Sequence, residues 1–476
     1  MAYFALILWP FLATSLFFML GPGRGLIWSV AVGYLVLPEA MAIDFPGLPI
    51  YDKVSAISLA ALLGVILTRN RMEVGATLCA DPKITRRLLA MLFVVCFVVP
   101  LGTWLTNPET LVNGPVVRPS LRMNDAVNMS SNMVMRFIPL VLAFYVLRTE
   151  ALQRELLIAL VATTVAYTPL ILFEWRMSPQ LHQWVYGYFQ HVWLQHVRGG
   201  GFRPIVFLSH GLVIGLLLMT ALLAAVAVSR DKTQSRPMFL LIAFWIFLVL
   251  VMSRNFGALV LAILFAPVVF LFPARLQVRV AVAISLFILT YPAIKQLGYS
   301  PDQKILEVVA PLSPERAHSF NVRLENESIL LARAAEKPVF GWGGWGRTRV
   351  FSDTGKDLTI IDGLWIVIMG QFGWAGYLTF FGVITLPFFS LRRVLRRKPI
   401  TPVIGGIAVL MSANLVDLIP NSSLSPLAMM MLGALYAFVS YDPVETAGKV
   451  APDMSGPDRE TRYSRFPPTH ARRLDV

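Results

Sequence analysis

Long apolar runs alternate with short polar segments along most of the chain. Many of these runs are close to the ~20 residues that a helix needs to cross a bilayer, where backbone polar groups must be satisfied internally. The pattern therefore predicts an all-α fold, a polytopic bundle of about 12 to 13 transmembrane helices. The expected spans lie near residues 3–20, 25–38, 54–68, 88–105, 132–147, 155–174, 204–228, 237–252, 255–273, 279–297, 363–390, 402–420 and 425–441. The first two are close enough to form one irregular hairpin.

One polar segment, residues 298–362, is much longer than the other connections. Connections of more than ~15 residues are uncommon unless they are functional or disordered. This one is too rich in aromatic and apolar residues to be a disordered linker. Within it, residues 319–338 place apolar positions at helical spacing, with Ser319 as the predicted N-cap and Pro338 as the stop. We therefore expect a long loop that contains an amphipathic helix, which on pattern alone could equally be a solvated surface helix.

The last residues of the chain differ from the rest. Residues 443–476 are rich in Pro, Asp and Arg and contain no apolar run, so they predict a disordered, basic cytoplasmic tail. We expect two parts. Residues 1–442 form the transmembrane bundle, including the loop 298–362, and residues 443–476 form the tail.

Composition agrees with a membrane protein and excludes a water-soluble fold. The chain is 56% hydrophobic and 14% charged, and its mean hydropathy is +0.66, values that soluble domains rarely reach. A transmembrane barrel would give short alternating segments, which are absent from the sequence. The two cysteines, Cys79 and Cys96, have a spacing that suits neither a metal site nor an obvious disulfide, so we interpret them as packing residues.

The net charge of +14 does not indicate nucleic-acid binding, because the Lys and Arg residues form short clusters between apolar runs. Such clusters favour the cytoplasmic side of a membrane. The segment 391–398 and the tail set the orientation, and alternation brings further basic segments to the same side, at residues 69–87, 148–154, 230–236 and 275–279. The segments expected on the extracytoplasmic side are residues 106–131, 175–203, 253–255 and 298–362.

Four arginines lie on the expected outer side, where the positive-inside tendency gives no reason for them. They are Arg198, Arg203, Arg254 and Arg323. A guanidinium presents paired donors that match a phosphate, and all four are expected near the depth of a lipid diphosphate head group. Each one alone is explained as well by snorkelling to lipid phosphates or by pairing with nearby acidic residues.

Asp362 stands at the start of the apolar run 363–390. Its carboxylate suits a helix N-cap as well as a base that accepts a proton. Trp342 and Trp345, in the preceding stretch, offer flat apolar faces to sugar rings, although anchoring at the membrane interface explains a tryptophan equally well. Arg347 in the same stretch is a further candidate for substrate binding.

Histidines occur in the segment 175–203, at His182, His191 and His196. Their spacings of nine and five residues fit no zinc motif, so we interpret them as part of an interfacial aromatic belt. His210 lies in an expected span and suits either a buried hydrogen-bonding residue or a polar cavity. We expect neither a metal nor a cofactor.

The segments around Arg323 and Asp362 carry a recognisable order of motifs. Asp362-Gly363 is followed, after nine residues, by Gly373-Trp-Ala-Gly376. This resembles the His-(Asn/Ser/Gln)-x9-Gly-x-x-Gly pattern of the O-antigen ligase and polymerase superfamily. The stretch 323–346 is similar to that family's Arg, helix and Pro-x-x-Gly-x-Gly block.

Two upstream motifs agree with this resemblance. The stretch 198–212 is similar to the family's Arg-x-x-Gly-x-Phe segment before a spanning helix, and Ser253-Arg254 resembles its Ser-Arg turn. The resemblance covers residues 195–380 well and the remainder only by hydropathy. One departure is clear: the family's histidine is Asp362 here, and Gly363 replaces the amide or hydroxyl residue after it.

The resemblance implies a metal-independent enzyme of the bacterial inner membrane that transfers glycans from an undecaprenyl-diphosphate carrier on the periplasmic face. It implies catalytic roles for Asp362, Arg323 and Arg198. The residues expected to bind substrate are Arg203, Arg254, Trp342, Trp345 and Arg347. Fixed arginines would stabilise the charge that develops on the leaving diphosphate, and a base would take the proton of the acceptor hydroxyl.

The predicted function is therefore a membrane glycosyltransferase. Because aspartate is a weaker base than histidine, we favour a polymerase of O-antigen or exopolysaccharide repeats over an O-antigen ligase that attaches glycan to the lipid A core. The expected partners are an undecaprenyl-diphosphate-linked oligosaccharide, a glycan or lipid acceptor and the bilayer, with no nucleic acid. A lipid-linked oligosaccharide flippase or transporter, and a catalytically silent scaffold, are the alternatives from other classes.

Overall fold

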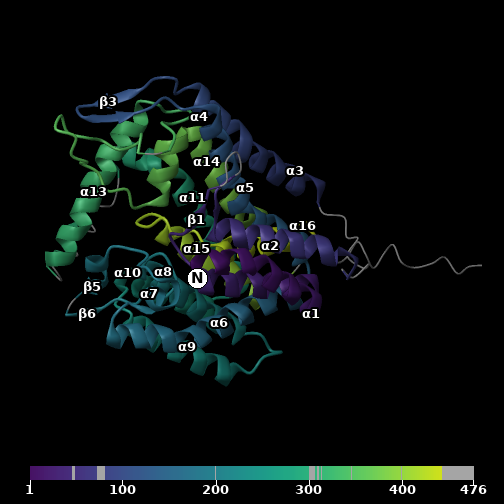
Figure 1. The fold of residues 1–476 in the computed structure, drawn as a ribbon. Helices are drawn as coiled ribbons and strands as arrows, with labels where there is room; N and C mark the ends of the chain where they lie inside the picture. The colour runs from purple at the N-terminus through teal and green to yellow at the C-terminus, as the bar shows by residue number, and fades with distance from the viewer. Residues whose placement is uncertain are drawn as a thin grey trace, which may run out of the picture.

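The computed structural model describes residues 1–44, 49–71, 81–198, 200–299, 306–307, 310–311, 314–344, 346–397 and 399–441. The predicted tail therefore lies outside the described residues. Within them, eight helices are long and apolar enough to cross a membrane, and four shorter apolar helices accompany them. The chain is an all-α bundle of membrane type, as the hydropathy pattern predicts (Figure 1).

The first half of the chain forms helices that mostly follow the predicted spans. A π-helical turn, Val94–Val98, joins α3 to α4, so that the three form one continuous helix that is apolar enough to cross a membrane. The segment α7 is short and lies outside the expected spans. The bounds are α1 Ala2–Val36, α2 Lys53–Thr68, α3 Pro82–Phe93, α4 Val99–Leu105, α5 Met123–Val146, α6 Glu150–Met177 and α7 Leu181–Tyr186, with 3-10 turns at Arg69–Arg71 and Trp193–His196.

The helix α1 is the irregular hairpin that the sequence predicts for its first two runs. Gly21 has φ 77° and ψ 171°, which breaks the helix between the two halves. The halves then pack side by side: a Cβ at Gly25 would lie 2.7 Å from the Phe17 backbone, and one at Gly33 would lie 2.7 Å from the Trp9 ring. Glycines at the contact let the two halves approach closely.

The second half contains the most buried helix of the bundle, α8. Nearly all of its residues are buried, and it contacts α6, α9, α10 and α15. The bounds are α8 Gly211–Val228, α9 Arg236–Met252, α10 Phe256–Leu271, α11 Ala274–Gln296, α13 Pro314–Ala335, α14 Leu364–Val394, α15 Pro402–Asp417 and α16 Pro426–Ser440.

In the part of the chain that the structure describes, six short strands pair as three antiparallel two-stranded sheets outside the helices. Strands β1 (Ala42–Ile43) and β2 (Tyr51–Asp52) pair with Ala42 opposite Asp52. Strands β3 (Leu111–Asn113) and β4 (Val116–Arg118) pair with Leu111 opposite Arg118. Strands β5 (Val197–Arg198) and β6 (Gly201–Phe202) pair with Val197 opposite Phe202.

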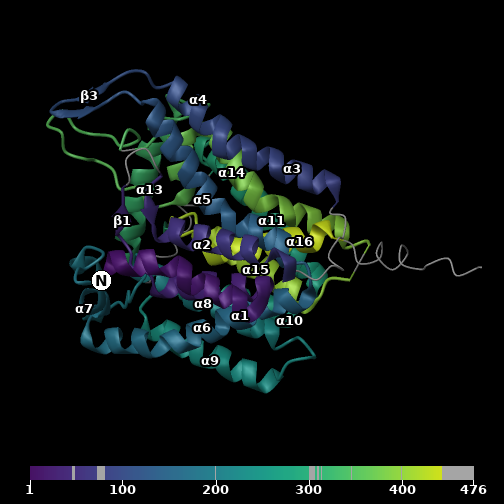
Figure 2. The ribbon, with the colours of Figure 1, turned by 45° about the vertical axis from the view of Figure 1, so that its right-hand side comes forward.

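These hairpins, α7 and α13 lie at one end of the bundle, which we call the loop end (Figures 1 and 2). At the opposite end, the basic end, short connections contact one another. Arg154 pairs with Asp231 across two connections, Arg230 donates to the carbonyl oxygen of Phe272, and the N–H of Asp81 donates to the carbonyl oxygen of Ser440. These contacts bring together parts of several connections that the sequence predicts to be cytoplasmic.

Three expected helix boundaries are wrong. The span predicted for 132–147 begins nine residues earlier, at Met123, within the segment expected to be a loop. The span predicted for 204–228 is helical only from Gly211, because residues 204–210 form a non-helical stretch, buried at Pro204–Val206 and Leu208, in which Val206 has φ 51°. The amphipathic helix predicted for 319–338 begins earlier, at Pro314, so Ser319 is not its N-cap. A proline is favoured at the first position of a helix because its missing N–H would have no helical partner there.

Candidate functional site

Two residues predicted to be catalytic, Arg323 of α13 and Asp362 before α14, lie together at the loop end. The Arg323 Nε atom is 3.4 Å from the Asp362 Oδ2 atom, and the side chains are 36% and 38% exposed. An exposed ion pair contributes little to stability. Both groups also remain open to a ligand that competes for them.

Asp362 does not act as the helix cap that its position suggested. The N-cap of α14 is Gly363, with no side-chain hydrogen bond. The first N–H of the helix, at Leu364, instead donates to the carbonyl oxygens of Leu418 and Asn421, both at 3.0 Å. Gly363 is required at this contact because a Cβ there would lie 2.0 Å from the carbonyl oxygen of Ile419. The carboxylate of Asp362 is thus left to face Arg323.

One face of α13 holds the helix against the residues that precede α14. Asn326, one turn after Arg323, accepts a hydrogen bond from the Ile360 N–H at 2.7 Å through its Oδ1 atom. Glu327 accepts one from the Trp365 Nε1–H at 3.4 Å and pairs with Lys295 of α11. Because positions three and four apart share a helix face, these contacts fix the direction in which Arg323 points.

The glycine motifs that carry the family resemblance meet in space. Gly373 interrupts α14 with φ 60° and ψ −161°. The interruption lets the N–H groups of Trp374 and Ala375 donate to the carbonyl oxygens of Pro338 and Val339, at 2.7 and 3.0 Å. A Cβ at Gly373 would lie 2.5 Å from that same backbone.

The segment after α13 also donates hydrogen bonds to the backbone of α14. Trp342 N–H donates to the carbonyl oxygen of Gly370, and Gly343 N–H donates to that of Gln371, both at 2.9 Å. Gly341, at φ 67°, would carry a Cβ only 2.5 Å from the Gln371 backbone. The segment after α13 is therefore docked into the break in α14, and this docking sets the position of α13 above Asp362.

A second pair of predicted residues, Arg203 and Arg254, also lies together. The Arg203 Nη2–H donates to the carbonyl oxygen of Arg254 at 3.4 Å. The Arg254 guanidinium packs on the β6 backbone, since a Cβ at Gly201 would lie 2.4 Å from its Nη2 atom. Arg254 itself has φ 60°, an uncommon backbone state for a non-glycine residue. The side chain of Arg198 lies outside the described residues.

Arg347 and Trp342 have contacts that favour a structural role over the predicted substrate contact. Arg347 is 2% exposed, and its donors reach the carbonyl oxygens of Trp342, Glu109 and Pro119 and the Asn107 side chain. The Trp342 ring is buried, its Nε1–H donates to the Arg333 carbonyl oxygen at 2.7 Å, and the Arg333 guanidinium covers its face. Trp345 lies outside the described residues.

Glu174, at the end of α6, is a positioning residue that the sequence analysis missed. The residue is fully buried. Its Oε1 atom accepts hydrogen bonds from the N–H groups of Gln180 and Leu181 at 3.1 and 3.0 Å. Its Oε2 atom accepts those of Ile205 and Val206 at 2.9 and 2.7 Å. One carboxylate thus replaces the helical hydrogen bonds that the non-helical stretch 204–210 lacks, and holds both ends of the segment that carries Arg203.

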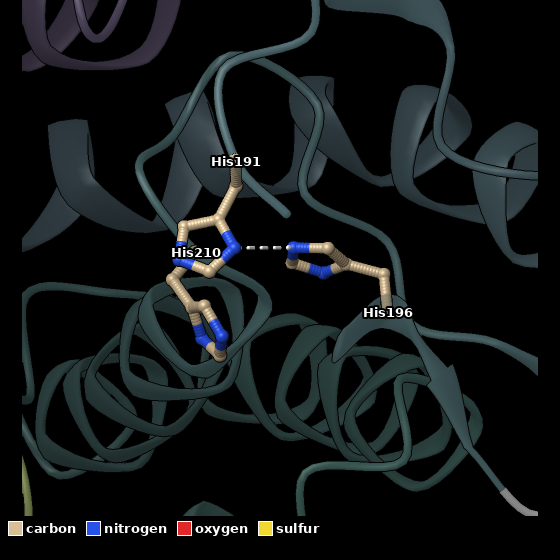
Figure 3. Close-up of side chains that lie close together, drawn as sticks. All are labelled: His191, His196 and His210. Carbon is tan, nitrogen blue, oxygen red and sulfur yellow. Dashed lines mark hydrogen bonds between the residues drawn. The ribbon is translucent and has the colours of Figure 1, made fainter. Parts of the chain in front are cut away.

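Three histidines that the sequence spacing separated come together beside Arg203 (Figure 3). The His196 Nε2 and His191 Nδ1 atoms are 3.3 Å apart. The His210 ring lies 4.7 and 5.0 Å from theirs, centroid to centroid. Burial lowers the pKa of His196 to about 4, with smaller contributions from His191 and Arg203. His196 is therefore neutral at pH 7. His182 is separate, bonded to Tyr188 and Glu39.

Comparison with known proteins adds no relative. No protein-family model and no curated protein matches the chain. The fold and the site define a class of protein: an all-α protein of membrane type with a partly exposed Arg323–Asp362 pair at its loop end.

Proposed function

We propose that the chain is a membrane glycosyltransferase that uses a polyprenyl-diphosphate-linked glycan at the extracytoplasmic face of a bacterial inner membrane. The observation that carries this proposal is the Arg323–Asp362 pair, 3.4 Å apart and partly exposed. It joins a phosphate-binding group and a proton acceptor at the expected outer side. The family resemblance, which rests on the same two segments, supports the same reaction.

In this reaction the acceptor hydroxyl oxygen bonds to the anomeric carbon while the bond from that carbon to the diphosphate oxygen breaks. The bonding electrons leave with the diphosphate, and the hydroxyl proton passes to the Asp362 carboxylate. Arg323, fixed by the neighbouring contacts of α13, is placed to stabilise the charge that develops on the leaving group. Because the ion pair that Arg323 forms with Asp362 is partly exposed, a diphosphate can replace that contact at little cost.

Arg203 and Arg254 are the proposed further diphosphate contacts, and they lie at the same end of the bundle, on or beside the β5–β6 hairpin (Figure 1). An arginine guanidinium can donate two parallel hydrogen bonds to a phosphate, which is the reason for proposing these two residues. Arg347 and Trp342 are left out of the proposed site because protein groups already occupy their polar atoms.

The test is a glycan assay with paired variants. We expect Arg323→Ala and Asp362→Ala each to lower product formation by about 100-fold or more, the usual cost of removing one charge-stabilising group from an active site. Arg349→Ala and Asp357→Ala are the matched controls, because they remove an exposed Arg–Asp pair from the same loop. Normal product from folded Arg323→Ala and Asp362→Ala variants would rule out this site.

The form of the product separates the proposed reactions. A polymerase lengthens the carrier-linked chain, and an O-antigen ligase moves the chain to a lipid core. A flippase, the alternative from another class, moves the carrier-linked glycan across vesicles without changing its length. We propose the polymerase, because the proton acceptor is a carboxylate and not the histidine of the resembled pattern.

A further inference from the structure

We propose that His191, His196 and His210 bind one divalent cation of the zinc class at the loop end. This inference goes beyond the proposed glycan transfer and does not depend on it. The ligand atoms that the three rings offer all lie within 4.8 Å of one another. Imidazole nitrogen is a common ligand of zinc and of the neighbouring transition metals.

The spacing of the nearest two nitrogens suits a metal as well as a hydrogen bond. Nitrogens bound to zinc at 2.0–2.1 Å in a tetrahedral arrangement lie about 3.3 Å apart. The His191 Nδ1 and His196 Nε2 atoms are separated by 3.3 Å. The ligand atoms of His210 lie within 4.8 Å of those of the other two rings, so this ring must move closer to share one cation with them.

Packing alone does not account for the polar atoms of His196. The residue is fully buried, and its Nδ1 atom has no hydrogen-bond partner among the described residues. Buried polar atoms nearly always have a partner, so an exception calls for an explanation. The cation would be bound by Nε2, the nitrogen of this ring that faces His191, and the ring proton would then lie on Nδ1.

The protein backbone holds the rings in place without the cation. The His196 carbonyl oxygen accepts a hydrogen bond from the Arg203 N–H at 2.8 Å, which extends the β5–β6 pairing. His210 is the N-cap of α8, and its Nδ1 atom accepts a hydrogen bond from the Leu212 N–H at 3.0 Å. Glu174 holds the backbone before His191, at Gln180 and Leu181, and the backbone before His210, at Ile205 and Val206. A site supported in this way loses little freedom when it binds its ligand.

Cation binding exchanges one interaction of His210 for another. A nitrogen that accepts the Leu212 hydrogen bond uses its lone pair, so the ring must release that N–H or change tautomer to bind a metal. Leu212 N–H is one of the four amides at a helix start that have no helical partner, and water can satisfy it. Three histidines leave the fourth position of a tetrahedral ion open to water or to an anionic oxygen.

The test uses the full chain in detergent, stripped with a chelator and then titrated with zinc or cobalt(II). We expect one bound ion per chain and the visible absorption of tetrahedral cobalt. The key variant is His210→Asn, because asparagine still caps α8 but offers no imidazole. It should weaken binding by more than about 100-fold, the upper effect of losing only a supporting group around a metal.

His470→Asn, in the part of the chain outside the described residues, is the control and should bind as the unsubstituted chain does. A second readout needs no variant: zinc should protect His191 from acylation by diethyl pyrocarbonate. A binding ratio well below one ion per chain, equal affinity in His210→Asn, or unchanged acylation of His191 would each overturn the proposal. If the unsubstituted chain binds the metal but shows no glycan transfer, the proposed function is refuted and the metal site is not.

Discussion

At the residue scale, the same side chain has a different role depending on the partners around it. Arg347 and Arg323 both precede Asp362 in one polar loop, and the sequence gives both a role at the substrate. In the structure Arg347 is 2% exposed and bonded to protein carbonyl oxygens, whereas Arg323 is partly exposed and forms an ion pair with Asp362. A guanidinium can bind a diphosphate only if its N–H donors can leave their present acceptors for the phosphate oxygens.

This difference predicts opposite outcomes for two conservative changes. Arg347→Lys replaces a planar guanidinium, which donates to several carbonyl oxygens, by a single ammonium group. Some of these oxygens are then left without a donor, so the free energy of unfolding should fall by about 1–3 kcal/mol. Thermal unfolding in detergent measures the loss, and activity per folded molecule should stay near that of the unsubstituted chain. Arg323→Lys should instead leave the unfolding temperature unchanged and lower activity. The reverse pattern would assign Arg347 to the substrate.

Glu174 gives a second prediction at this scale. Glu174→Gln leaves one carbonyl oxygen where two carboxylate oxygens accepted four backbone N–H groups, and its amide N–H groups face two of those donors. We expect a loss of about 1–3 kcal/mol for each donor left unpaired. Limited proteolysis between residues 178 and 210 should become faster.

The control for this change is Glu155→Gln. Glu155 also lies in α6, but its side chain is 20% exposed and pairs with Arg24, which is 59% exposed. It also accepts a hydrogen bond from the Trp28 Nε1–H at 3.2 Å, which a glutamine oxygen can still accept. Loss of an ion pair with an exposed partner costs at most about 1 kcal/mol. Equal proteolysis of the two variants would show that Glu174 does not hold the segment that carries Arg203.

At the element scale, two glycines decide where apolar helices break. Gly21 and Gly373 have φ values of 77° and 60°, with ψ values of 171° and −161°. Other residues avoid this backbone region, and holding one there costs about 1–3 kcal/mol. The break at Gly21 turns α1 into a hairpin. The break at Gly373 exposes backbone N–H groups that receive the segment after α13.

The surroundings of the two glycines predict different costs for alanine. A Cβ at Gly21 meets nothing within 4 Å, whereas one at Gly373 would lie 2.5 Å from the Pro338 and Val339 backbone. Gly21→Ala should therefore cost only the backbone term, about 1–3 kcal/mol. Gly373→Ala should cost more and should also lower glycan transfer, because the displaced loop carries α13 away from Asp362. Unfolding temperature and activity measured together check both statements.

At the scale of the whole molecule, the two ends of the bundle differ in how their charges are arranged. At the loop end, basic side chains pair with acidic ones, as in Lys337–Glu109 and Arg349–Asp357. At the basic end, short connections carry clusters such as Arg392, Arg393, Arg396 and Arg397. Basic clusters in short loops favour the cytoplasm. We therefore expect the loop end to face the extracytoplasmic side.

Labelling with a membrane-impermeant maleimide checks this orientation. In a background with Cys79 and Cys96 replaced by serine, Thr354→Cys at the loop end should react in intact spheroplasts. Lys232→Cys at the basic end should react only after the membrane is opened. Both positions are exposed in the structure, so accessibility within the protein does not confound the comparison. If position 232 reacts in intact spheroplasts and position 354 does not, the orientation is the reverse of the expected one, and the proposed site is contradicted.

The sequence by itself determined the class of fold and most of its elements. Apolar runs of membrane-spanning length are local features, and they predicted the helices, the initial hairpin and the helix within the long loop. Motif order also predicted that Arg323 and Asp362 belong to one site. These results follow because hydrophobic burial and helix formation depend mainly on nearby residues.

Only the tertiary structure decided which polar groups meet. The non-helical stretch 204–210 is as apolar as a span, and its stability depends on Glu174, which comes from another helix. His191 and His210 lie 19 positions apart in the sequence and share one cluster. Arg347 is structural because distant carbonyl oxygens surround it. Spacing along the chain cannot reveal such contacts, because the folding of the intervening residues sets the distance between their atoms.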